Sequence, residues 1–68
     1  MITEIGIAAG DIWHHLDQKG SATLDQLTSS IRKPRELLLM SLGWLAREGH
    51  VTLEGPETGY RASLATKR

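Results

Sequence analysis

The chain has 68 residues, with eight basic and eight acidic side chains and no cysteine. This length predicts one small domain, residues 1–68, that buries only about 60% of the surface its unfolded chain exposes. The absence of cysteine excludes disulfides and Cys-rich metal centres, and the balanced charge lacks the basic excess that most dedicated nucleic-acid binders carry.

Residues 3–19 are predicted to form the first helix. Its apolar residues recur at helical spacing, and they are Ile5, Ala9, Ile12 and Leu16. We expect Thr3 to be the N-cap and Gly20 to end the helix. No basic-then-apolar leader precedes this helix and no apolar run approaches the ~18 residues of a membrane span, so we expect a cytoplasmic protein.

A second, short helix is predicted over residues 24–31. Thr23, followed three residues later by Gln26, has the form of a capping box. Residues 21–23 just before it could add a minimal third strand to the sheet predicted below. The helix ends at Arg32-Lys33, because the residue before Pro34 avoids helical geometry.

A third helix is predicted over residues 34–48, with Pro34 in its first turn. Gly49 follows, where glycine takes a left-handed conformation cheaply. The spacing then alternates over residues 50–54 and 60–64, separated by turn residues 55–59, which predicts a hairpin. We expect the ordered part to span residues 3–64 and residues 65–68 to fray.

This order of elements, together with two glycine-tryptophan segments, resembles a known family. The segments are Ile5-Gly6 with Ala9-Gly10-Asp11-Ile12-Trp13, and Leu42-Gly43-Trp44-Leu45-Ala46-Arg47-Glu48-Gly49. They are similar to small bacterial and archaeal stand-alone winged helix-turn-helix proteins of uncharacterised function. The resemblance implies a mostly α fold with a small β-hairpin wing: three helices plus a two- or three-stranded sheet.

The resemblance also implies a DNA-binding role, such as transcription regulation, with duplex DNA as the partner. The second helix of such a motif enters the major groove, which here is the helix from Pro34 to Glu48. The basic residues that this implies as DNA contacts are Arg32, Lys33, Arg35, Arg47 and Arg61. Arg35 stands at the start of that helix, where it could also reach a guanine edge.

The composition of the third helix favours an alternative function. If Leu38, Leu42 and Leu45 define its core side, the opposite side carries Glu36, Leu39, Met40, Gly43 and Arg47. Apolar residues at a position that should contact bases indicate a protein interface. We therefore predict a second possible partner surface at Leu39, Met40 and Gly43, through which the chain docks on a protein or forms a homodimer.

The position of Gly43 inside the predicted helix needs an explanation, because glycine there destabilises a helix by about 1 kcal/mol relative to alanine. Gly6 and Gly10 lie on one ridge of the first helix. We expect Trp44, or the turn at Gly43, to pack into that ridge, so that tighter packing offsets the cost of Gly43. The same glycines would also permit close approach by another chain.

No feature of the sequence indicates catalysis. His14, His15 and His50 invite a metal site, but adjacent histidines on a helix point about 100° apart, and the pair Asp11 and His15 supplies only two ligands. The chain has neither a nucleophile motif nor a phosphate-binding glycine loop. We therefore expect no enzyme activity, no metal and no cofactor.

Overall fold

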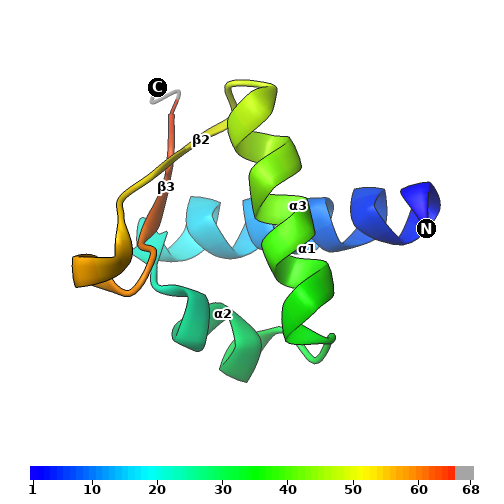
Figure 1. Cartoon of the computed structure of the whole chain (residues 1–68), viewed down its shortest axis with the longest axis horizontal. Helices are drawn as coiled ribbons and strands as arrows, with labels where there is room; N and C mark the ends of the chain where they lie inside the picture. The colour runs from blue at the N-terminus through cyan, green and yellow to red at the C-terminus, as the bar shows by residue number, and fades with distance from the viewer. Residues whose placement is uncertain (66–68) are drawn as a thin grey trace.

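The computed structural model describes residues 1–65, which form three helices and a three-stranded antiparallel sheet (Figure 1). The elements are α1 (Ile2–Lys19), β1 (Ser21–Ala22), α2 (Leu24–Ser30), α3 (Arg35–Arg47), β2 (Val51–Leu53), the 3-10 turn η1 (Pro56–Thr58) and β3 (Ala62–Leu64). In Figure 1, α3 crosses α1, and the sheet stands at the end of the molecule away from the N-terminus. The predicted fold class, mostly helical with a small sheet, is confirmed.

The strands are arranged in the order β1-β3-β2. In the hairpin, Val51 pairs with Leu64 and Leu53 with Ala62. The minimal third strand is also present, because Ala22 pairs with Ala62 on the other edge of β3. The sheet therefore ties the segment before α2 to the C-terminal hairpin.

One hydrophobic core joins all three helices to the sheet. Its largest fully buried apolar side chains are Ile12, Leu16, Leu27, Leu38 and Leu42. The one buried polar side chain among the described residues is Ser41, whose hydroxyl donates to the Leu37 carbonyl at 2.8 Å or the Ile5 carbonyl at 3.3 Å. The second distance places the backbone of α1 close to α3, so the two helices approach closely at Ser41.

The predicted start of α1 is wrong. The helix begins at Ile2 with Met1 as its N-cap, and Thr3 lies inside the first turn. The Ile5 amide donates to the Met1 carbonyl at 3.0 Å, so the helical hydrogen bonds already begin at the first residue. At the other end, Gly20 has φ +93° and its amide donates to the Leu16 carbonyl at 2.7 Å, which agrees with the predicted stop.

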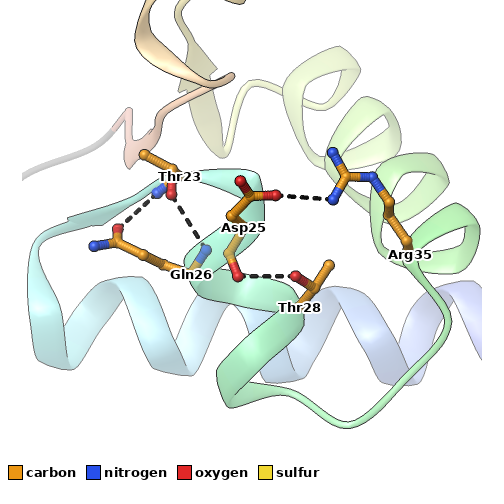
Figure 2. Close-up of polar contacts among 5 residues, drawn as sticks. All are labelled: Thr23, Asp25, Gln26, Thr28 and Arg35. Carbon is orange, nitrogen blue, oxygen red and sulfur yellow. Dashed lines mark hydrogen bonds and ion pairs between the residues drawn. The ribbon is translucent and has the colours of Figure 1, made fainter.

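The capping box at the start of α2 is confirmed (Figure 2). The Gln26 amide donates to the Thr23 hydroxyl at 3.2 Å, and the Thr23 amide donates to the Gln26 side-chain oxygen at 2.9 Å. The helix ends at Ser30, one residue earlier than predicted, because Ile31 is extended with ψ 116°. Ile31 thereby starts the turn that leads into α3.

The third helix is shorter by one residue at each end than predicted. Pro34 is its N-cap rather than its first helical residue, because ψ of Pro34 is 141°, while its carbonyl accepts from the Leu38 amide at 3.1 Å. Glu48 is the C-cap, and Gly49 follows with φ +81°, in the left-handed region as expected.

The wing strands are also shorter than predicted. Tyr60 was expected in the second strand, but its φ is +56°, so it belongs to the turn that follows η1. The alternation predicted over residues 50–54 places Val51 and Leu53 on one face, yet Val51 is buried and Leu53 is 42% exposed at the end of β2. The apolar alternation is therefore shorter than the sequence pattern indicates. Residues 65–68 were expected to fray, but the Ala65 amide donates to the His50 carbonyl at 2.9 Å. Residues 66–68 lie outside the described residues.

The packing predicted for the helical glycines is wrong. A methyl group added at Gly6, Gly10 or Gly43 would meet no heavy atom within 4 Å beyond its own helix and chain neighbours. Trp44 does lie beside the ridge of Gly6 and Gly10, but its side chain is 46% exposed and does not fill it. Intramolecular packing therefore does not account for Gly43.

Gly43, inside α3, and Gly49, just after its end, should respond oppositely to alanine. Gly43→Ala should stabilise the fold by up to about 1 kcal/mol, because open space receives the methyl group and alanine favours the helix. Gly49→Ala should destabilise it by about 1–2 kcal/mol, because L-residues are strained at φ +81°. Chemical denaturation measures both, and a destabilising Gly43→Ala would contradict the open surroundings of Gly43.

Candidate functional site

The outward face of α3, which we define as Glu36, Leu39, Met40, Gly43 and Arg47, is exposed along its whole length. The side chains of Leu39 and Met40 are 49% and 44% exposed. The residues of α3 that are buried are Leu38, Ser41, Leu42 and Leu45. The helix therefore has the orientation that the sequence pattern predicted, with two large apolar side chains in solvent.

The basic residues predicted to contact DNA do not form one cluster. Arg35, at the start of α3, donates from Nη1 to Oδ1 of Asp25 on α2 at 2.9 Å (Figure 2). The side chains of Arg35 and Asp25 are 55% and 85% exposed, so water competes with this ion pair. Exposed pairs of this kind contribute about 0–1 kcal/mol, which leaves Arg35 free to exchange partners.

Lys33 and Arg32 lie against α1. The Lys33 ammonium is 3.7 Å from the Asp11 carboxylate. Both basic residues line an open depression of about 300 Å³ together with Glu4, Ile7, Pro34 and Leu37. The N-terminal ammonium of Met1, 2.8 Å from Glu4, lowers the pKa of that carboxyl group, so the depression keeps an anionic side chain beside its cations.

Arg61 and Arg47 lie apart from the turn between α2 and α3 that carries Arg32 and Lys33. Arg61, just before β3, donates from Nη1 to the Ser21 hydroxyl at 3.2 Å and is half-buried. Arg47 is twelve residues from Arg35 at the other end of α3, or about 18 Å along the helix axis. Within residues 1–65, Arg32 and Arg47 take part in no ion pair.

The sequence analysis did not predict that two acidic residues would lie beside the basic residues of this surface. Asp25 holds Arg35 and Asp11 faces Lys33, so two of the five predicted DNA contacts have an anion beside them. Asp25 and Arg35 are ten residues apart and on different helices, and no helical or strand spacing predicts such a contact. Only the angle of the turn between α2 and α3 brings them together.

The described residues give no sign of metal chemistry or of a membrane span. No group of three or more His, Asp or Glu side chains in this part of the chain could hold a metal ion. His14, His15 and Asp11 do line one open depression of about 420 Å³ beside Arg32 and Lys33. None of the helices described is both long and apolar enough to cross a bilayer.

Comparison with known proteins shows a family match. The model of a winged helix-turn-helix domain family of unknown function (DUF2582) matches residues 1–63. No curated protein and no solved structure matches the chain. The match covers every helix and all of the sheet except the last residue of β3.

The availability of Arg35 is tested by a double-mutant cycle. Asp25→Asn, Arg35→Gln and the double variant should give a coupling free energy below about 1 kcal/mol, because both side chains are largely exposed. Urea denaturation of the four proteins measures it. A coupling above about 2 kcal/mol would mean that Asp25 holds Arg35 too strongly for any other anion to compete.

Proposed function

Because the chain belongs to this winged helix-turn-helix domain family, we propose that it binds duplex DNA through phosphates, with little selection of base sequence. The observation that carries the proposal is the solvent-exposed α3 with arginines at both ends. Arg35 stands at its start and Arg47 at its end, and Arg32 precedes it in the turn. Phosphate contacts position such a helix on DNA without conveying sequence information.

The chemistry of the outward face of α3 supports weak sequence selection. Specific contacts to base edges come chiefly from Arg, Lys, Asn, Gln, Ser, Thr, Glu or Asp. Between its terminal charged residues, this face offers only Leu39, Met40 and Gly43. Apolar side chains there can touch a thymine methyl group but cannot form the bidentate hydrogen bonds that discriminate between base pairs.

The zero formal net charge supports weak binding. Eight acidic side chains oppose eight basic ones, so no long-range field draws the chain to DNA. The ion pairs of Asp25 with Arg35 and of Asp11 with Lys33 must also break before these basic side chains can bind phosphates. Affinity therefore depends on few contacts, and we expect regulation of transcription, if the domain performs it, to require avidity or a second protein.

Salt titration tests the proposed function. Binding to a random-sequence duplex should weaken steeply with salt, with a log–log slope of about 0.9 per phosphate contact. Arg32→Gln, Arg35→Gln and Arg47→Gln should each reduce the slope by about one. Lys19→Gln is the matched control, because it removes one charge from the last turn of α1 and should leave the slope unchanged.

Fluorescence anisotropy at several salt concentrations gives these slopes. The proposal would be overturned if the affinity did not change with salt concentration. It would also be overturned if Lys19→Gln reduced the affinity as much as Arg35→Gln does. A preference above about a hundredfold for one DNA sequence would overturn the proposed lack of sequence selection, since one mismatched base pair costs about 1–3 kcal/mol.

A second candidate function is contact with a protein through Leu39, Met40 and Gly43. It is favoured by the half-exposed side chains of Leu39 and Met40 and by the open space at Gly43. Apolar patches of this kind usually mark contacts, and a two-fold pair is the commonest arrangement. A partner on this face would cover the surface that DNA needs, so the two candidates exclude each other at any moment.

Leu39→Glu combined with Met40→Glu tests the second candidate. Both side chains are half-exposed, so the double variant should fold, with an unfolding free energy within about 1 kcal/mol of the unmodified chain. If this face joins two copies, saturating duplex DNA should dissociate them. Circular dichroism and light scattering provide the measurements; a double variant that unfolds, or association that DNA leaves intact, would reject this candidate.

A further inference from the structure

Both tryptophans lie outside the hydrophobic core. Trp13 on α1 is 38% exposed and Trp44 on α3 is 46% exposed, while the largest fully buried side chains are leucines and an isoleucine. Tryptophan is highly buried on average, because it has the largest apolar surface of any side chain. In a chain with so small a core, two indoles left in solvent call for an explanation.

The two indoles lie at the same groove. It has a volume of about 280 Å³, and its lining residues are Gly6, Ala9, Gly10, Trp13, Trp44, Leu45 and His50. The Trp44 ring lies 6.3 Å from the His50 ring, centroid to centroid, so a neighbour in the following segment supports this indole. We call this surface the tryptophan groove.

The floor of the tryptophan groove is open. Around Gly6 and Gly10, the space that a side chain would occupy holds no atom within 4 Å. The groove extends one helical turn along α1, because Ile2 precedes Gly6 by four residues. Ile2 is 85% exposed. An apolar stripe therefore runs along α1 with a glycine-lined hollow in it.

We propose that the tryptophan groove binds a second copy of this chain. A two-fold interface joins the same surface on both partners, so that surface must carry both protrusions and hollows. This one does: its indoles protrude and its glycines leave a hollow beside them. Each copy can place an indole over the glycine ridge of the other.

The chemistry of the lining favours a protein surface over an anion. No Asp, Glu, Lys or Arg lines the groove, so it offers phosphate no cation, and the arginines assigned to DNA lie elsewhere. The zero formal net charge of the chain removes electrostatic repulsion between copies. Both observations favour an apolar contact between two identical chains.

The available area fits a weak dimer. A standard interface takes about 800 Å² from each partner, or about a sixth of the 4581 Å² surface of this chain. At ~200 Å² per indole, the exposed fractions of Trp13 and Trp44 supply roughly 170 Å². Ile2 and the glycine backbone add only part of the remaining area, so the apolar contact is smaller than a standard interface and association through it is weak.

The tryptophan groove and the outward face of α3 point in different directions. Trp44 follows Gly43 directly, and successive residues on a helix are rotated by about 100°. Pairing through the groove therefore leaves Arg35 and Leu39 in solvent, while Arg47, three residues after Trp44, lies at the edge of the groove. A dimer formed this way remains free to bind DNA, unlike a dimer formed through Leu39 and Met40.

Two glycine substitutions distinguish the two surfaces. Gly10→Glu places a charge inside the groove, and Gly43→Glu places one on the outward face of α3. Neither meets an atom within 4 Å at its Cβ, and glutamate favours a helix over glycine, so both variants should fold. Light scattering and sedimentation equilibrium from about 10 μM to 1 mM, with circular dichroism as the folding check, give the dimer dissociation constant.

The unmodified 68-residue chain should dimerise within this concentration range, with a blue shift of tryptophan emission. Gly10→Glu should raise the dissociation constant at least tenfold and abolish the shift, while Gly43→Glu should change it less than threefold. A monomer at 1 mM, or association that Gly43→Glu abolishes and Gly10→Glu leaves intact, would overturn the proposal. Gly10→Glu should bind the random duplex through the same arginines, so a failure to dimerise and a failure to bind DNA are scored separately.

Discussion

The crossing of α3 over α1 is the constraint on which the rest of this structure depends. Ile12 and Leu16 from α1 are buried together with Leu38 and Leu42 from α3. Ser41 lies where the two helices approach closely, with its hydroxyl 3.3 Å from the Ile5 carbonyl. A larger residue at Ser41 would separate the helices, because helix packing distances depend on the side chains at the contact.

This crossing fixes which residues of α3 reach solvent and in which direction. With Leu38, Leu42 and Leu45 turned inward, Leu39, Met40 and Gly43 must face outward, between Arg35 and Arg47. Trp44, rotated toward α1, then lies beside Gly6 and Gly10 rather than in the core. The same packing therefore produces an outward face with few base-reading side chains and an apolar groove next to it, and the two proposed interactions use these two surfaces.

The sequence was sufficient to predict the fold and the orientation of α3. Helical spacing, the capping box at Thr23 and Gln26, and Gly49 carry local signals that tertiary structure did not override. Thr3 and Tyr60 were misplaced because the ends of elements depend on hydrogen bonds to the rest of the chain, which periodicity does not contain. The ion pair of Asp25 with Arg35 and the open groove at Gly10 arise from how helices cross, and no local pattern encodes a crossing.

Cysteine accessibility along α3 tests the central claim most directly, because the natural chain has no cysteine to interfere. Single cysteines at Leu39, Met40 and Gly43 should react with a thiol reagent at rates near those of an unfolded peptide. A cysteine at Ser41 or Leu42 should react at least about a hundredfold more slowly, since its reaction requires the core to open. Equal rates at all five positions, or protection at Leu39 and Gly43 with rapid reaction at Ser41 in dilute protein, would contradict this orientation of α3 and the two surfaces derived from it.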